Sequence, residues 1–336
     1  MRFVDETVAR RLALEGAVYL AQSVDERGQF HYWRPSETSK IRVRRYNTLR
    51  HCGSVWAMLE TARTLGLPIG IIEGGLRALR YALTEFIRPF GAPDIFCLLD
   101  DEKIKLGGSG LALIALAAAQ HIDPNEQRLK IATGLGRYVQ SQAKDNGDFI
   151  HGRMHPMGVE YPLKSEYYTG QALFGLLALS EMTVDRSWGD FAIRCLKQLA
   201  TRDYGVAEYS HWMLYALEAS EKLEATPALR ALGARIATAI INRPKNNDGK
   251  ENATLLACMS EGLLAWVRLV GSSPPRDGEP DVASVVRKVR QNLSLQFKYR
   301  NVDGSFVGGS GDSGVRIDYV QHNISAFAAF ALFPKL

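Results

Sequence analysis

The chain has 336 residues, of which 46% are hydrophobic and 23% charged, a balance that is typical of a globular protein with a large core and excludes a disordered or fibrous chain. Its formal net charge of +5 comes from 41 Lys and Arg against 36 Asp and Glu. The positive excess is spread along the chain instead of forming one basic tract, so we expect an anionic small molecule or polymer as partner and no nucleic acid.

The cysteines and the apolar stretches indicate a reducing compartment and no membrane span. The four cysteines lie far apart in apolar surroundings without a Cys-x-x-Cys pair, as buried free thiols do: Cys52, Cys97, Cys195 and Cys258. The N-terminus lacks the basic-then-apolar order of a signal peptide, and the longest apolar candidate, 106–119, is too short to cross a bilayer. We predict a cytoplasmic protein, although a chain cut from a larger parent would look the same.

In chain order, six amphipathic helices alternate with six apolar ones. The amphipathic helices carry charged residues at helical spacing on one face, which predicts half-buried surface helices. They cover 6–24, 74–89, 125–143, 187–200, 226–241 and 281–295.

Each apolar helix begins with a few polar or charged residues and continues with small and branched apolar ones on all sides. A helix of this kind must be buried on most of its surface, so the amphipathic helices are expected to cover it. The polar starts lie near 50, 108, 168, 210, 252 and 321, at irregular intervals that argue against an open solenoid. We predict an all-α fold, a single domain over 1–336 that closes into a ring of six outer and six inner helices.

Three loops share an acidic residue, a glycine and an aromatic residue, at 25–30, 145–149 and 303–306. Glycine accepts the positive φ of a tight turn, and the aromatic side chain can pin the loop to the ring. Each loop comes shortly before an inner helix, so we expect the long loops and the polar starts to share one end of the ring.

Six such helix pairs resemble the (α/α)6 toroid, the six-hairpin architecture of many glycoside hydrolases, polysaccharide lyases and sugar epimerases, and of prenyltransferase and terpene-cyclase barrels. Two shorter pieces, 316–324 and 167–172, are similar to the aspartate-tyrosine-histidine and glycine-glutamine segments in the helical domain of glucuronyl C5-epimerases. The resemblance implies a carbohydrate-active enzyme whose site lies in the central cavity.

The last polar start has the largest number of reactive side chains. Asp318 and His322 are four residues apart and share one helix face, where a carboxylate can orient an imidazole. The alternative for each is an N-cap and a core histidine. Beside them, Arg316, Gln321 and Asn323 are predicted to bind substrate.

The third polar start offers a second acid or base. Glu166 could act in this way if burial raises its pKa, and helix capping is its alternative role. Tyr168 could assist proton transfer, and packing is its alternative. Lys164 just before them is predicted to bind substrate.

The first polar start gathers arginines that could clamp a carboxylate or phosphate, because a guanidinium group matches those anions in a bidentate way. Arg50 and His51 are predicted to bind substrate, while facing solvent is the less favoured alternative for Arg44 and Arg45. The remaining starts add further candidates for substrate binding: Lys105, Tyr209, His211, Trp212 and Asn252. Trp212 could instead be a core residue.

Other chemistries lack their motifs. The glycine-rich stretch 107–110 lacks the Lys-Ser/Thr ending of a phosphate-binding loop, and neither a His-Glu-x-x-His motif nor a Cys/His ligand array is present. We therefore predict no cofactor and no metal.

The combined features favour an enzyme that acts on an acidic, uronate-type sugar or glycan by general acid/base chemistry. Glu166 and Asp318 are the predicted acid/base pair, His322 and Tyr168 assist, and Arg50, Lys105 and Arg316 bind the anion. Hydrolysis is slightly favoured over elimination and epimerisation. The alternative is a non-catalytic glycan- or peptide-binding module of a larger biosynthetic protein.

Overall fold

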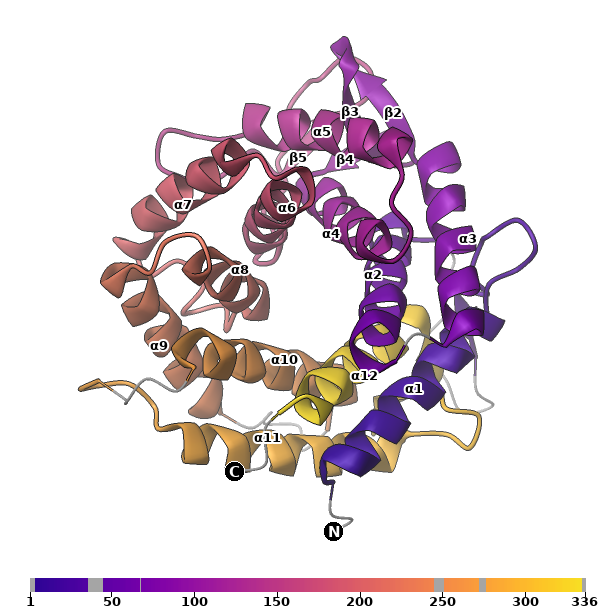
Figure 1. The fold of residues 1–336 in the computed structure, drawn as a ribbon, viewed down its shortest axis with the longest axis vertical. Helices are drawn as coiled ribbons and strands as arrows, with labels where there is room; N and C mark the ends of the chain where they lie inside the picture. Colours follow the sequence, from indigo (N-terminus) through magenta and orange to yellow (C-terminus); the bar gives the residue numbers. More distant parts are fainter. Residues whose placement is uncertain (1–3, 36–44, 67, 245–250, 272–275, 334–336) are drawn as a thin grey trace.

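The computed structural model describes residues 4–35, 45–66, 68–244, 251–271 and 276–333. In this part of the chain, twelve α-helices form two concentric rings (Figure 1). The inner ring consists of α2 (Thr48–Leu65), α4 (Leu106–Ile122), α6 (Tyr168–Thr183), α8 (His211–Glu221), α10 (Ala253–Val270) and α12 (Ile317–Ala331). The outer ring consists of α1 (Glu6–Gln22), α3 (Ile69–Glu85), α5 (Glu126–Ser141), α7 (Arg186–Ala200), α9 (Pro227–Ile241) and α11 (Val282–Gln296).

The inner ring is closed. Each inner helix packs against the inner helices before and after it, and the last one, α12, packs against the first, α2. The predicted all-α (α/α)6 toroid is therefore confirmed. The physical reason is the one that the sequence indicates: the inner helices are apolar on all sides and find partners both along the ring and in the outer layer.

Glycines let neighbouring inner helices approach closely. A Cβ atom on Gly110 of α4 would lie 2.4 Å from the backbone oxygen of Gln171 on α6, and one on Gly175 of α6 would lie 2.9 Å from the backbone oxygen of Gly110. Neither position has room for a larger residue. The glycine-rich start of α4 is thus explained by helix packing.

The bounds predicted for the second outer helix, 74–89, are wrong by a few residues. The helix, α3, spans Ile69–Glu85. The chain then continues into β2 (Ile87–Phe90) and β3 (Ala92–Asp100). Apolar residues continue from the helix into the strand, so hydrophobic periodicity alone did not show where the helix ends.

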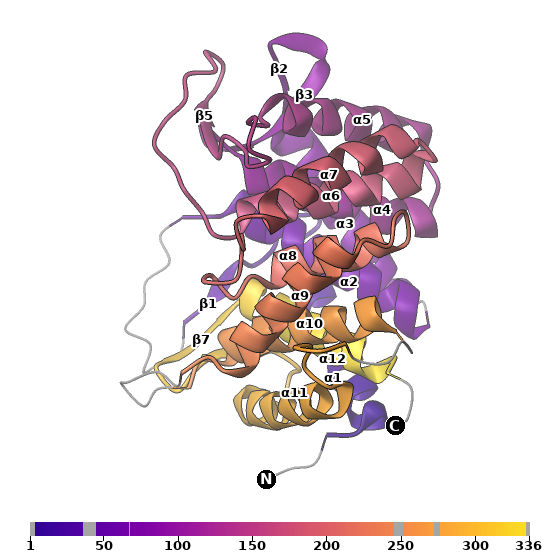
Figure 2. The same ribbon diagram turned by 90° about the vertical axis from the view of Figure 1, so that its left-hand side faces the viewer.

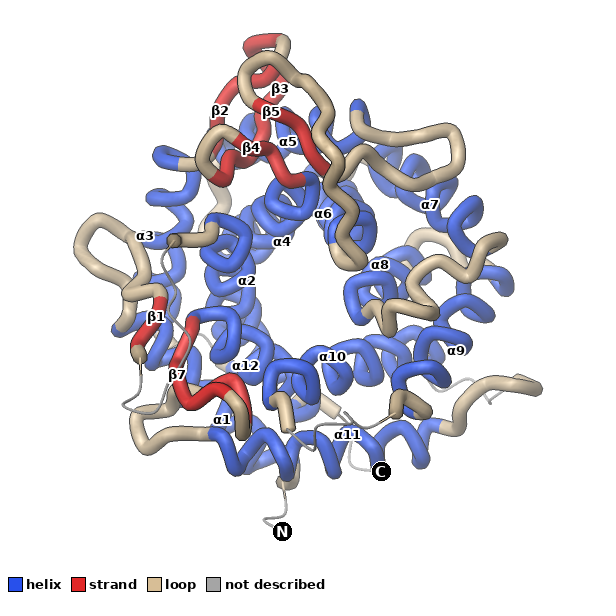
Figure 3. The backbone as a smooth tube through the Cα atoms, turned by 180° about the vertical axis from the view of Figure 1, so that it is seen from behind, coloured by secondary structure: helices blue, strands red, loops and turns tan. Residues whose placement is uncertain are grey.

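Two small antiparallel sheets lie on the loops. One has the strand order β2-β3-β4-β5, with β4 at Lys103–Lys105 and β5 at Gly152–Met154; the other has the order β1-β7-β6, with β1 at Trp33–Arg34, β6 at Val307–Gly309 and β7 at Asp312–Arg316. The strands and the long loops gather on one side of the double ring (Figures 2 and 3). Since β4 and β7 run directly into α4 and α12, this is the side on which the inner helices begin.

The three glycine-containing turns adopt the predicted conformation. Gly28, Gly147 and Gly304 have φ values of +102°, +81° and +87°. The aromatic residue of each turn is buried: Phe30, Phe149 and Phe306. Each turn follows an outer helix and is fixed to the ring by its aromatic side chain.

The prediction that 106–119 is the longest apolar stretch is wrong, because α10 is longer. By length and composition alone α10 could cross a membrane, but 72% of it is buried inside the protein. A core helix of a folded ring meets the same criterion.

Candidate functional site

A cluster of charges joins the first and the last inner helix where both begin. Arg316 donates to both oxygens of Asp318, at 2.5 and 2.9 Å, and Arg50 Nε lies 3.0 Å from Asp318 Oδ2. Arg50 also donates to the hydroxyl of Tyr32, at 2.6 Å, and its side chain is 35% exposed. The sequence analysis predicted Arg50, Arg316 and Asp318 as residues of one site, and in the structure they are in contact.

Two histidines lie side by side, one at the start of α8 and one in the second turn of α12. His211 is the first residue of α8 and His322 lies on α12; their ring centroids are 5.5 Å apart, in an edge-to-face arrangement. His322 Nδ1 lies 2.8 Å from Glu261 Oε1, and the other oxygen of Glu261 accepts a hydrogen bond of 2.9 Å from the hydroxyl of Tyr215. His211 Nε2 is buried and has no hydrogen-bond partner among the described residues.

The two imidazoles differ in their proton affinity. Burial lowers the pKa of His211 well below its ordinary value, and the neighbouring His322 lowers it further. Burial also disfavours the charged form of His322, but Cys258 and the carboxylate of Glu261 outweigh it and hold the pKa of His322 well above its ordinary value. The arrangement therefore pairs a neutral imidazole with a protonated one.

One group of described residues has the composition of a metal site. A ring nitrogen of His211, a ring nitrogen of His322 and Cys258 Sγ lie within 4.8 Å of one another.

The predicted residues of the third polar start differ in their exposure. Glu166 and Lys164 are exposed in the loop before α6, while Tyr168 is half-buried in the first turn of that helix. Burial raises the pKa of Tyr168 to about 12, so its hydroxyl stays protonated at neutral pH. The ring of Tyr167 lies 6.0 Å from that of His211, which links this helix start to the histidine pair.

Two further predicted binding residues are engaged in local contacts. Lys105 Nζ lies 2.5 Å from a carboxylate oxygen of Asp100. The ring of Tyr209 is covered by the guanidinium group of Arg243, at 4.4 Å from its centroid.

Four predicted binding residues have roles in the scaffold. His51 is fully buried between helices, Asn252 caps α10 through its contact with the backbone N–H of Leu255, and Asn323 donates to the backbone oxygen of Tyr319. Gln321 is buried, with its amide oxygen against Gly53. The candidate Arg44 lies outside the described residues.

An aromatic layer crosses the centre of the ring below the histidines. Trp56 lies 5.7 Å from Trp212 and 5.6 Å from Tyr215, and the ring of Phe174 stacks on that of Tyr215 at 5.3 Å. Trp212, predicted as a stacking platform or a core residue, is 3% exposed and belongs to this layer.

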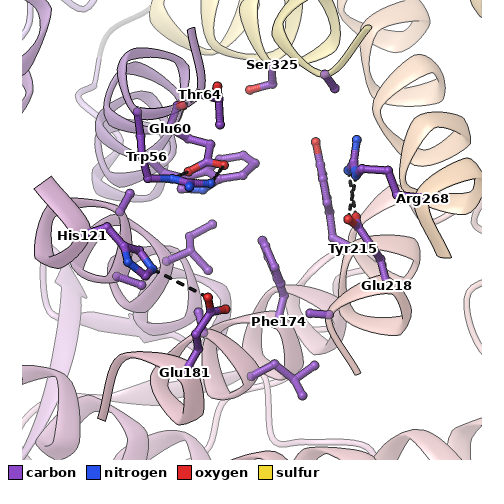
Figure 4. A pocket seen from close by; sticks show the side chains of 18 of the residues that line it. Trp56, Glu60, Thr64, His121, Phe174, Glu181, Tyr215, Glu218, Arg268 and Ser325 are labelled. Atoms are coloured by element: carbon purple, nitrogen blue, oxygen red, sulfur yellow. Dashed lines mark hydrogen bonds and ion pairs between the residues drawn. The ribbon is translucent and has the colours of Figure 1, made fainter. Parts of the chain in front are cut away.

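A cavity of about 470 Å³ lies beyond this layer, towards the ends of the inner helices. Trp56, Phe174 and Tyr215 face it, and charged residues including Glu218 and Arg268 surround it (Figure 4). The cavity thus opens on the side opposite the charge cluster, and Tyr215 reaches from the cavity to Glu261.

The sequence patterns did not point to Glu261, Cys258 and Tyr215. All three lie inside apolar helices, away from the polar starts. A signal was present for Glu261, because a carboxylate in an otherwise apolar, fully buried stretch of α10 requires a partner.

No protein-family model matches the sequence, and no curated protein matches it either. Solved structures share its fold. A D-mannose isomerase superposes with a TM-score of 0.75 at 8% identity, over 96% of this chain and 97% of its own. A cellobiose 2-epimerase from Spirochaeta thermophila gives 0.70 at 13% identity, with 97% of both chains covered. An α-1,6-mannanase from a Salegentibacter species gives 0.69 at 11% identity, over 98% of this chain and 99% of its own.

Proposed function

We propose that the protein is a sugar-processing enzyme that interconverts an aldose and a ketose by proton transfer between His211, His322 and the substrate. The observation that carries this proposal is the pair of adjacent imidazoles, one with an unpaired nitrogen and one held by a carboxylate. The shared fold with a D-mannose isomerase and a cellobiose 2-epimerase supports the choice of a sugar as substrate.

The chemistry needs a base and an acid beside the first two carbons of an open-chain sugar. One imidazole removes the proton from the carbon next to the carbonyl, and the electron pair moves to form an enediol. The other imidazole donates a proton to the carbonyl oxygen, which gives the enediol. The same imidazole then takes the proton of the hydroxyl group on the second carbon, where the new carbonyl forms, while the first imidazole returns its proton to the former carbonyl carbon. Glu261 stabilises the charged form of His322 throughout.

The geometry favours isomerisation over a two-base epimerisation. Since the two rings touch, with centroids 5.5 Å apart, no sugar carbon fits between them, and the substrate meets both from one side. Proton transfer on one face of an enediol interconverts aldose and ketose, whereas inversion at a single carbon by two bases requires groups on opposite faces.

Hydrolysis has weaker support. A glycosidase needs two carboxyl groups that flank the scissile bond. Both oxygens of Asp318 are engaged by arginines, and Glu261 is fully buried behind His322. The predicted pair of Glu166 and Asp318 combines an exposed loop residue with a carboxylate that is already neutralised.

We assign the charge cluster to substrate orientation. Two guanidinium groups and one carboxylate carry a net charge of +1, so Arg50 and Arg316 can bind the hydroxyl groups of a neutral sugar or the carboxylate of a uronate. A panel of aldoses and uronates therefore belongs in the first activity screen.

The test is deuterium incorporation. The protein is incubated in D2O with D-mannose, D-fructose, cellobiose and D-galacturonate, and the products are followed by NMR. We expect a ketose or aldose product with deuterium at the carbon next to the carbonyl. Substituting His211→Asn or His322→Asn should lower the rate by about 100-fold or more, the usual contribution of a general acid or base.

The matched control is His155→Asn, in an exposed loop, which should leave the rate unchanged. If the product is an epimer and no ketose forms, the reaction is an epimerisation and the proposed isomerisation is wrong. Equal activity of the His211, His322 and His155 variants would refute the proposed roles.

A further inference from the structure

Cys258 lies against the histidine pair and has no part in the proposed proton transfer. It lies on α10, one turn before Glu261, while His211 and His322 come from α8 and α12. Three inner helices thus converge with one thiol and two imidazoles, whose ligand atoms lie within 4.8 Å of one another.

We propose that His211, Cys258 and His322 form a binding site for a borderline-soft divalent cation of the Zn²⁺ type. Thiolate sulfur and imidazole nitrogen are the ligands that Zn²⁺ selects, and three protein ligands with a fourth position for water form a common zinc geometry.

An unpaired buried nitrogen supports this site independently of the cluster. His211 is 3% exposed, and its Nε2 has no hydrogen-bond partner among the described residues. A buried polar atom without a partner is costly, and a metal ion would satisfy its lone pair.

The surroundings of His322 match those of a metal ligand. Metal-bound histidines usually donate their second ring nitrogen to a carboxylate, which fixes the ring and raises its basicity. Glu261 holds His322 Nδ1 at 2.8 Å in this way, and Tyr215 in turn holds Glu261. Nε2 is then the nitrogen of His322 that remains for a cation.

The site needs a small contraction to close around the ion. Ligand atoms in a tetrahedral zinc site are about 3.3–3.6 Å apart, given Zn–N and Zn–S distances of about 2.0 and 2.3 Å. The three atoms, which lie within 4.8 Å of one another, therefore need to draw together by at most about 1.5 Å. The Cys258 thiol and Nε2 of the protonated His322 each give up a proton to solvent as they bind the cation.

Binding at this site has a consequence for the proposed isomerase. The cation and the sugar would compete for the same two imidazoles, so the cation would inhibit turnover. This consequence rests on the proposed function, whereas the site itself does not.

The experiment uses the whole chain, stripped of metal with a chelator and kept reduced. Co²⁺ is titrated into the protein, and the near-ultraviolet absorption is recorded. We expect a thiolate-to-cobalt charge-transfer band that saturates at one Co²⁺ per chain and disappears when Zn²⁺ is added. In Cys258→Ser the band should be absent, and in His211→Asn the Zn²⁺ affinity should fall by at least about 10-fold.

The matched control is Cys195→Ser on the outer helix α7, which should keep the band. A circular-dichroism melt checks that each variant is folded, and Cys258→Ala replaces Cys258→Ser if the latter is not. A band that survives in the Cys258 variant, or the lack of any band in the unmodified protein, would overturn the site. Zinc binding by a protein that turns over no sugar even in its metal-free form would refute the isomerase and leave the site standing.

Discussion

Asp318 accepts hydrogen bonds from Arg316, its close neighbour in sequence, and forms an ion pair with Arg50 from the opposite end of the chain. Its side chain is only 10% exposed, so its charge depends on these two partners. Removing one member of such a group leaves the others uncompensated.

We therefore expect Asp318→Asn to lower the free energy of unfolding by about 1–3 kcal/mol, because Arg50 and Arg316 then repel each other without a carboxylate between them. Urea denaturation at neutral pH measures the change. The control is Asp190→Asn, which removes an exposed partner of Arg186 and should cost less than about 0.5 kcal/mol. Equal effects of the two substitutions would contradict the role given to Asp318.

His51 is a second residue whose surroundings fix its protonation. Its Nε2 lies 2.8 Å from the backbone oxygen of Ala78, which can only accept, so Nε2 carries the hydrogen and Nδ1 accepts from the hydroxyl of Tyr46. Burial lowers the pKa of His51 from 6.5 to about 4, although the bond to Ala78 acts in the opposite direction. The folded protein thus keeps His51 neutral in a pH range where the unfolded chain is protonated.

This difference predicts a loss of stability on acidification. In the unfolded chain His51 binds a proton below pH 6.5, whereas in the folded protein it is protonated only below about pH 4. The free energy of unfolding therefore falls as the pH falls through this range. In His51→Gln the decrease should be smaller. Urea denaturation at several pH values tests it, with the exposed His31→Gln as the control that should retain the full decrease. An unchanged pH profile in His51→Gln would contradict the assignment.

At the scale of elements, the glycines of the inner helices decide how closely the ring packs. A Cβ atom on Gly110 would meet the backbone of α6, whereas one on Gly70, in the outer helix α3, would have no neighbouring atom within 4 Å among the described residues. The two residues are chemically identical and differ only in what surrounds them.

Gly110→Ala should lower the melting temperature, because its Cβ would press α4 away from α6 at a typical overpacking cost of about 1–3 kcal/mol. Gly70→Ala should raise it slightly, because alanine favours a helix over glycine by about 1 kcal/mol. Thermal unfolding followed by circular dichroism measures both. A pair of variants with the same melting temperature would show that the contact between α4 and α6 adapts.

At the scale of the whole molecule, Tyr215 links the cavity on one side of the double ring to the histidine pair on the other side. Its ring lines the cavity and stacks on Phe174, while its hydroxyl donates to Glu261, which holds His322. We expect Tyr215→Phe to lower the free energy of unfolding by about 1–3 kcal/mol, because Glu261 loses a buried donor.

The same substitution should lower kcat of the proposed isomerase more than it changes KM, because it acts on the orientation of His322 and not on sugar binding. Steady-state kinetics on the substrate found in the screen measure both constants. Tyr81→Phe, on the outer helix α3, is the control and should change neither. A rise in KM at constant kcat would place Tyr215 in substrate binding instead.

The toroid could be predicted because its main signal is local. Charged residues on one face of every second helix and apolar residues all round the others are visible without knowing any contact. The strands were not predicted. Strands β4 and β5 have three residues each, from which no periodicity can be read, and the nine residues of β3 do not alternate between apolar and polar.

The residues of the candidate site stood out in the sequence only where they coincide with a helix start. Arg50, Asp318 and His322 were found because polar residues there interrupt an apolar pattern. Glu261 and Cys258 acquire their significance only when α10 lies beside α8 and α12, so their partners come from ring closure. The expected absence of a Cys/His array reflects the same limit, since the proposed ligands are scattered over three helices.

Ring closure also has a kinetic consequence. Arg300 donates to Glu15, 285 positions earlier, and α1 packs along α12. The first helix therefore lacks its main partner until the last hairpin exists. Contacts between such distant segments slow folding, because the loop entropy must be lost before they form. During synthesis on the ribosome, α1 can pack on α2 and α3 early, but the part of its apolar face that packs on α12 stays uncovered until α12 is made, so early intermediates expose apolar surface that favours aggregation.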